Sequence, residues 1–189
     1  MMARRVARPT QRGVGFRVSD QYVEQHPEAD VSATELCINV LFAAELLGRE
    51  LDQTLRPFGL GRGSHNVLQI LGGATGPLTP TEVMARLTVT SATVTGLLDT
   101  LETRGLARRR PHPSDRRSVL VEITDEGRAL LDELVPRLIE REKQWAACLR
   151  PGQREQLIRL LGLLQGHLQS DDLKTETPRT GPAHDAAVR

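Results

Sequence analysis

One stretch near the middle of the chain restricts the possible folds most, because its hydrophobic period changes from that of helices to that of strands. Thr79 can cap a helix, Pro80 suits the first helical position, and Glu82 completes a capping box with Thr79. After a tight turn, a second helix is predicted from a cap at Thr90 to about residue 104, with Gly105 at its end. The sequence therefore predicts two short helices joined by a turn.

Two short strands follow this helix pair, and an arginine-rich loop separates them. Residues 106–110 and 119–124 have strand patterns, whereas the loop between them reads PHPSDRRS. Six arginines and one acid in residues 104–117 give a local net charge of +5, although the whole chain has a formal net charge of +1. A helix fits the major groove of DNA, and a thin hairpin can follow the backbone or enter the minor groove. We therefore interpret residues 62–124 as a winged helix-turn-helix DNA-binding lobe.

Long helices are predicted on both sides of this lobe. Ser32 and Glu35 form a capping-box pattern at the start of a helix over about 33–56, and further helices are expected over about 125–169. Their aliphatic stripes exceed what a small lobe could cover, so we expect the N- and C-terminal helices to form a homodimer interface. The expected fold is mainly α (α+β), a DNA-binding lobe with a helical dimerisation region.

Composition agrees with a helical domain over residues 32–169. Aromatic residues make up only 3% of the 189, so an aliphatic core is expected. Residues 1–31 are predicted to be a flexible basic arm with a short extra helix, and residues 170–189 a disordered tail. We expect no membrane span, because no uninterrupted apolar run reaches about 18 residues.

The sequence offers little for catalysis. It shows no nucleophile elbow, metal-ligand spacing or phosphate-binding loop, so we expect no enzyme, no cofactor and no metal site. Cys37 and Cys148 fit neither a disulfide framework nor a zinc site, and we expect both to be buried small hydrophobic residues in a reducing cytosol. The expected location is cytoplasmic and nucleoid-associated.

The chain resembles the multiple-antibiotic-resistance-regulator (MarR) family over roughly residues 32–168. The resemblance lies in TVTGLLDTLETRGLARR and in the following PSDRRSVLVEITDEG, which have the order and spacing of that family. It implies a winged helix-turn-helix regulator with a helical dimer interface. The Asp-x-Arg wing pattern of the family falls on Asp115 and Arg117, which implies that Arg117 enters the minor groove and that Asp115 orients it.

We therefore predict a homodimeric repressor that binds double-stranded DNA at a palindromic operator, with half-sites roughly 34–36 Å apart. Hydroxyl groups at the start of a helix suit contacts with phosphates and base edges, and Thr90 is expected to cap the helix as well. The candidate DNA-contacting residues are Thr79, Thr81, Thr90, Ser91, Thr93, Thr95, Arg110, Asp115, Arg116 and Arg117.

The resemblance also implies release of DNA by a small aromatic or anionic effector. The segment QYVEQHPEADVSATEL is similar to the N-terminal extension of the urate-responsive subgroup, whose ligand pocket would map onto Tyr22, Asn66 and Arg109. Tyr22 and Asn66 replace a tryptophan and an acid of that subgroup, and Leu97 replaces an arginine. These differences favour a less charged ligand than urate, or none.

Two alternatives to DNA-binding repression remain open at this point. One is a winged-helix protein-interaction module without DNA binding, and the local charge of +5 argues against it. The other is a cysteine redox-sensing regulator, like the peroxide-sensing subgroup of the same family. The spacing from Cys37 to Pro57 differs from that subgroup, and its partner tyrosines are absent. A structural role for Cys37 is therefore favoured.

Overall fold

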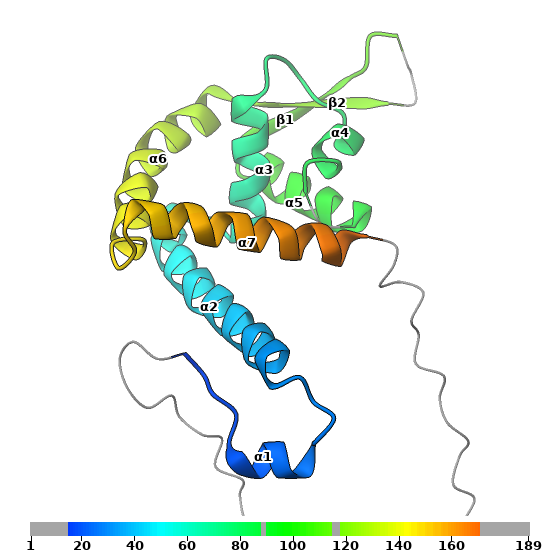
Figure 1. Ribbon diagram of the computed structural model, residues 1–189. Coiled ribbons are helices and arrows are strands. Elements are labelled where there is room, and N and C mark those ends of the chain that lie inside the picture. The colour runs from blue at the N-terminus through cyan, green and yellow to red at the C-terminus, as the bar shows by residue number, and fades with distance from the viewer. Residues whose placement is uncertain (1–14, 88–89, 115–117, 171–189) are drawn as a thin grey trace, which may run out of the picture. The chain divides into compact units, whose positions relative to one another are not determined.

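The computed structural model describes residues 15–87, 90–114 and 118–170. The chain divides into two compact units, residues 1–141 and residues 142–189. In chain order the elements are α1 (Asp20–Gln25), α2 (Val31–Leu55), the 3₁₀ turn η1 (Arg56–Phe58), α3 (Arg62–Gly73), α4 (Pro80–Met84), α5 (Ser91–Thr103), β1 (Ala107–Pro111), β2 (Val119–Ile123), α6 (Asp125–Trp145) and α7 (Pro151–Gln169), as Figure 1 shows. The boundary between the two units falls near the end of α6, and α7 belongs to the second unit.

The core of the first unit lies between α3, α5 and the β1–β2 hairpin. Leu68 from α3 is buried there together with Leu98 and Leu101 from α5, and Val121 contributes from β2. Leu134 of α6 is also completely buried. The mainly helical fold with one small antiparallel sheet is therefore confirmed, and α5 and the two strands lie within one residue of their predicted bounds.

The hairpin is joined to the start of the helix pair by a short β-bridge. β1 and β2 run antiparallel, with Arg109 opposite Val121 and Arg108 opposite Glu122. Leu78, just before α4, bridges to Val121 through two backbone hydrogen bonds with N–O distances of 2.9 and 2.7 Å. The segment that leads into the helix pair is thus fixed to the sheet.

Two glycines allow the chain to enter and leave the hairpin. Gly105 has a φ of 68°, in the left-handed region that favours glycine, and it ends α5 as predicted. A Cβ atom on Gly127 would collide with the carbonyl oxygen of Leu106 and with the side chain of Ile123. The base of the hairpin is therefore closed by an approach that only glycine permits.

The start of α2 differs from the prediction. The side chain of Asp30 accepts a hydrogen bond from the Ala33 amide at 3.1 Å and caps the helix, and the Ser32 hydroxyl donates to the same carboxylate at 2.7 Å. The predicted Ser32–Glu35 capping box is wrong, because Asp30 lies two residues earlier and is an equally good capping residue. Glu35 is left to make other contacts.

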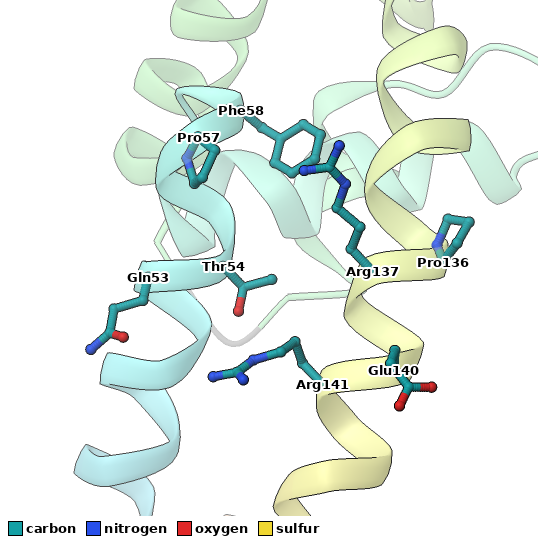
Figure 2. A pocket seen from close by; sticks show the side chains of 8 residues that line it. All are labelled: Gln53, Thr54, Pro57, Phe58, Pro136, Arg137, Glu140 and Arg141. Carbon is teal, nitrogen blue, oxygen red and sulfur yellow. The ribbon is translucent and has the colours of Figure 1, made fainter.

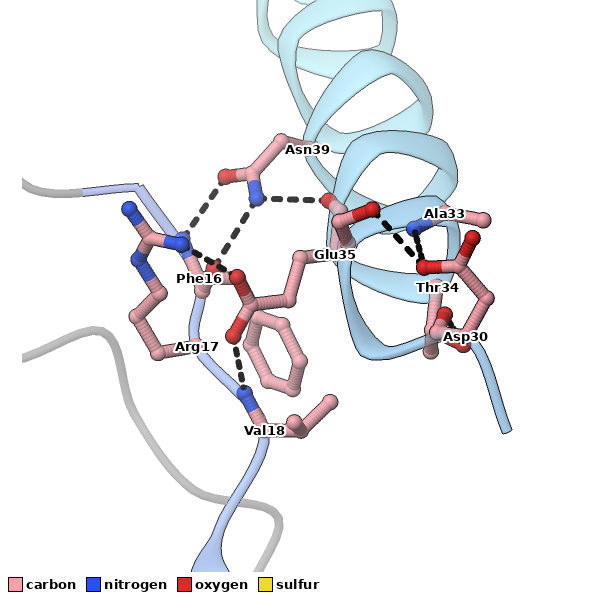
Figure 3. A network of polar contacts seen from close by, with 9 residues as sticks. Phe16, Arg17, Val18, Asp30, Ala33, Thr34, Glu35 and Asn39 are labelled. Atoms are coloured by element: carbon pink, nitrogen blue, oxygen red, sulfur yellow. Dashed lines mark hydrogen bonds and ion pairs between the residues drawn. The ribbon is translucent and has the colours of Figure 1, made fainter. Parts of the chain in front are cut away.

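Glu35 and Asn39 of α2 hold the segment Phe16–Val18 (Figure 3). Asn39 Oδ1 accepts from the Phe16 amide at 2.7 Å, and Asn39 Nδ2 donates to the Phe16 carbonyl at 2.9 Å. Glu35 accepts from the Val18 amide at 3.0 Å and forms an ion pair with Arg17. The hydrogen bond from Arg17 lowers the pKa of Glu35 below its usual value. The segment is thus fixed along the first half of α2.

Large apolar side chains on α2 and α7 face solvent. They include Leu41 (70% exposed) and Leu47 on α2, and Ile158 and Leu163 (73% exposed) on α7. The stretch Val31–Phe58 is long and apolar enough, by length and composition alone, to cross a membrane, and little of it is buried in the part of the chain that the structure describes. The expectation of no membrane-length segment counted only uninterrupted apolar residues, whereas the few charged residues within Val31–Phe58 leave its mean hydropathy high.

Both cysteines contradict the expectation that they are buried. Cys37 on α2 and Cys148 after α6 are exposed, and neither forms a disulfide. The expectation for Cys37 failed because the buried apolar core begins only at Leu55, near the other end of α2. An apolar stripe on a helix indicates which face needs cover, but it does not identify the element that covers it.

Candidate nucleic-acid interface

The capping box at the start of α4 has the predicted geometry. The Glu82 amide donates to Thr79 Oγ1 at 3.2 Å, while the Thr79 amide and hydroxyl donate to Glu82 Oε2 at 2.7 and 2.9 Å. These hydrogen bonds lower the pKa of Glu82 below its usual value. The hydroxyl of Thr79 is thus already used within the chain, whereas Thr81, the second residue of the helix, is exposed.

The start of α5, from its cap into its second turn, presents an exposed row of hydroxyl side chains. Thr90 accepts from the Thr93 amide at 3.4 Å, and the two hydroxyl oxygens lie 2.9 Å apart. Thr95 donates to the Ser91 carbonyl at 3.1 Å, and all four side chains are exposed. Because these side chains are small and uncharged, they allow close approach of another molecule to the helix and to its N-terminal amides.

The described arginines around the hairpin are engaged in ion pairs or hydrogen bonds within the chain, so their number overstates the positive charge available to a ligand. Arg108 Nε lies 2.7 Å from Glu122 Oε1, and Arg110 Nε lies 3.7 Å from Glu122 Oε2. Arg104 donates to the carbonyl oxygens of Phe58 and Gly59 at 2.8 and 2.6 Å. The local value of +5 counted only acids within residues 104–117. It omitted the acids that the fold brings beside the hairpin from α5 and β2.

Arg109 lies on the opposite side of β1 from Arg108, between the hairpin and α5. Its Nη1 atom lies 2.7 Å from Asp99 Oδ1 and 2.6 Å from Glu102 Oε2, and its backbone amide donates to Glu102 Oε1 at 3.0 Å. Its side chain is 26% exposed. Burial would lower the pKa of Arg109, but the hydrogen bonds that its guanidinium donates to both carboxylates outweigh it, so the pKa is raised.

The three predicted ligand-pocket residues have separate neighbours in the described part of the chain. The Tyr22 ring on α1 lies 4.8 Å from the His26 ring, and Asn66 on α3 is exposed beside His65. Arg109 is engaged with α5, as described above. The remaining predicted wing residues, Asp115, Arg116 and Arg117, lie outside the described residues. The hairpin is closed up to that loop by a hydrogen bond from the His112 amide to the Ser118 carbonyl at 3.2 Å.

A cavity of about 640 Å³, which was not predicted from the sequence, opens between the end of α2 and the middle of α6 (Figure 2). Arg137 lies over the Phe58 ring at 5.1 Å, and Arg141 Nη2 lies 2.6 Å from Glu50 Oε2. Its lining residues are Gln53, Thr54, Pro57, Phe58, Pro136, Arg137, Glu140 and Arg141. Two arginines four residues apart on α6 were the only hint of this cavity in the sequence. No pattern in the neighbouring residues indicated that α2 would form its opposite wall.

Comparison with known proteins identifies the family. Residues 58–118 match the sequence model of the protein family described as MarR family. The regulator PecS of Dickeya dadantii is 30% identical over 158 residues, which cover 81% of this chain and 95% of PecS. This chain belongs to the MarR family. It is a winged helix-turn-helix transcriptional regulator, as the resemblance in its sequence implied.

Solved structures of MarR-family proteins share this fold. Sco3205 of Streptomyces coelicolor, solved in complex with DNA, is 26% identical with a TM-score of 0.70, over 75% of this chain and 94% of Sco3205. BpsR of Bordetella bronchiseptica, whose DNA binding is regulated by 6-hydroxynicotinic acid, is 27% identical with a TM-score of 0.63. That match covers 69% of this chain and 98% of BpsR.

Proposed function

We propose that this MarR-family regulator represses transcription as a homodimer on a palindromic operator, with α5 in the major groove and the β1–β2 wing on the flanking DNA. The exposed hydroxyl row at the start of α5 supports this most directly, because α5 packs against β1 of the arginine-bearing hairpin (Figure 1). Sco3205, which has the same fold, was solved with DNA. The chain acts by binding rather than by catalysis, in the cytoplasm and at the nucleoid.

The homodimer is supported by the exposed apolar faces of α2 and α7. Most of the exposed large apolar side chains of the described residues lie on these two helices, and Leu41 and Leu163 are each at least 70% exposed. A monomeric protein rarely exposes so much apolar surface to solvent. A second copy of the chain would cover both faces, and two-fold symmetry would match a palindromic site. Residues 33–56 and 125–169 are therefore proposed as the dimerisation region.

The effector is proposed to bind the cavity between α2 and α6 rather than the triad of Tyr22, Asn66 and Arg109. Phe58 and two prolines offer an apolar wall, whereas Arg137 and Arg141, which pair with Glu133 and Glu50, offer guanidinium groups that can donate hydrogen bonds to an anion. This combination suits a small aromatic acid. BpsR, a relative of the same fold, is regulated by such a molecule.

The decisive experiment is selection of duplexes from a randomised library by the full chain, followed by binding measurements across a range of salt concentrations. Sequence-specific binding with a steep negative salt slope is expected, since each phosphate contact contributes about −0.9 to the slope. Arg117→Ala should weaken binding by about 1–3 kcal/mol in a folded dimer. Arg17→Ala, which lies outside both the lobe and the dimerisation region and removes an ion pair with Glu35, is the matched control.

Absence of any selected sequence, together with a flat salt dependence, would favour a protein-interaction module instead. The same result for the Arg117 variant and the wild type would contradict the assignment of the wing. Addition of 6-hydroxynicotinic acid or salicylate to the bound complex tests the effector proposal separately. Release that is lost on changing Arg137→Ala is expected.

A further inference from the structure

Arg109 joins the two elements that the proposed function places on DNA. It belongs to β1 of the wing, yet its guanidinium lies on Asp99 and Glu102 of α5 at 2.7 and 2.6 Å. The backbone amide of Arg109 adds a third contact to Glu102 at 3.0 Å. The two carboxylates are three residues apart on α5 and therefore point to the same side of the helix.

The only covalent connection between the wing and α5 is the turn at Gly105. A residue with positive φ ends the helix there, and β1 begins two residues later. The helix and the wing must contact the groove and its flank together, so their relative orientation affects binding at both places. A guanidinium that holds two carboxylates of the helix restricts this orientation more than one hydrogen bond could.

The same contact changes the charge on the exposed side of α5. Asp99 is 58% exposed, on the same lobe as the hydroxyl row formed by Thr90, Ser91, Thr93 and Thr95. An unpaired carboxylate there would repel the phosphates of a bound duplex. Arg109 offsets this repulsion, and its own 26% exposure leaves it little freedom to reach a phosphate.

We propose that Arg109 is a positioning residue for DNA recognition, which acts through Asp99 and Glu102 and does not contact DNA itself. The inference rests on the proposed function, in which α5 and the wing bind the duplex together. It assigns Arg109 to the orientation of the DNA-binding surface, and it removes this residue from the proposed effector pocket.

The test measures binding of the full chain to the duplex that the wild type selects and to a scrambled duplex, at several salt concentrations. Arg109→Ala is expected to weaken binding to the selected duplex about tenfold, which is about 1.4 kcal/mol. Binding to the scrambled duplex should change less, and the salt slope should stay the same because no phosphate contact is lost. Arg109→Lys should recover part of the affinity, since an ammonium can hold one carboxylate but lacks the planar fork.

Variants of Asp99 and Glu102 give the clearest test, because a positioning role and a direct contact of Arg109 with DNA predict opposite changes in affinity. With a positioning role, Asp99→Asn combined with Glu102→Gln weakens specific binding despite the removal of negative charge. With direct contact to phosphate, the same double variant binds more tightly, and Arg109→Ala lowers the salt slope by about one. Either of those last two results would overturn the proposal.

Controls separate this inference from the proposed function and from simple unfolding. Wild-type chain that selects no duplex refutes the proposed function itself, whereas normal selection with unchanged affinity of Arg109→Ala refutes only the inference. Arg17→Ala, outside the lobe and the dimerisation region, should bind like the wild type. Circular dichroism and sedimentation of each variant establish that the folded dimer is what is measured, and a variant that fails this check is replaced by Arg109→Gln.

Discussion

The lobe formed by α3, α5 and the hairpin differs from the helices α2 and α7 in how much of its apolar surface a single chain buries. In the lobe, apolar side chains such as Leu98 are buried, and the described arginines contact acids or carbonyl oxygens of the same chain. On α2 and α7, apolar side chains such as Leu41 and Leu163 are exposed. The lobe is complete in one copy of the chain, whereas the two helices need a further surface.

Removing a buried side chain of the lobe should have the largest effect on stability. Leu98→Ala leaves a cavity in the core, so the free energy of unfolding is expected to fall by about 2–5 kcal/mol. Urea denaturation followed by circular dichroism measures this change. An effect under about 1 kcal/mol would mean that the lobe is not the well-packed region.

Removing an exposed side chain of α7 should instead act on association. Leu163→Gln is expected to weaken the dimer by about 1.5–3 kcal/mol, since a leucine that a partner buries contributes about that amount. Sedimentation at several protein concentrations measures the dissociation constant. If the variant dimerises like the wild type, α7 is not part of the interface.

Glycine replacements in the two regions should change stability in opposite directions. Gly127→Ala places a methyl group against the Leu106 carbonyl and should destabilise the chain by about 1–3 kcal/mol. Gly162→Ala on α7 meets open space within one chain and should stabilise the helix by about 0.5–1 kcal/mol. A destabilised dimer from Gly162→Ala would show that a partner packs closely at this position.

The smallest effect is expected from pH, at the N-terminal segment. The pKa of Glu35 is lowered in the folded chain, so its contribution is present above the ordinary carboxylate pKa and is lost as the pH falls through the lowered value. Hydrogen exchange at the Phe16 and Val18 amides should therefore show full protection near neutral pH and lose it only in acid. Glu35→Gln should reduce the protection at neutral pH.

The sequence predicted the features that depend on neighbouring residues. The capping box of Thr79 and Glu82, the cap at Thr90 and the helix end at Gly105 are local arrangements, and all three are confirmed. The capping box at Ser32 failed because Asp30 competes for the same amides. Local patterns are decisive only where one residue alone can fill the position.

Features that depend on distant residues could not be predicted from the sequence. The contacts of Arg109 with Asp99 and of Arg104 with Phe58 need the fold to bring separate elements together. The cavity joins residues more than 80 positions apart, such as Gln53 and Arg137. The exposed cysteines follow from the position of the core, which an apolar stripe does not specify.

The turn at Phe58 and Gly59 has two neighbours at once. The Phe58 ring forms part of the cavity wall, and the carbonyl oxygens of both residues hold the Arg104 guanidinium at the end of α5. Because hydrogen bonds weaken steeply with poor geometry, a small shift of this turn alters the hold on Arg104. The end of α5 is therefore hydrogen-bonded directly to the turn that forms part of the cavity wall, and a molecule that fills the cavity should shift the NMR signals of the Arg104 side chain.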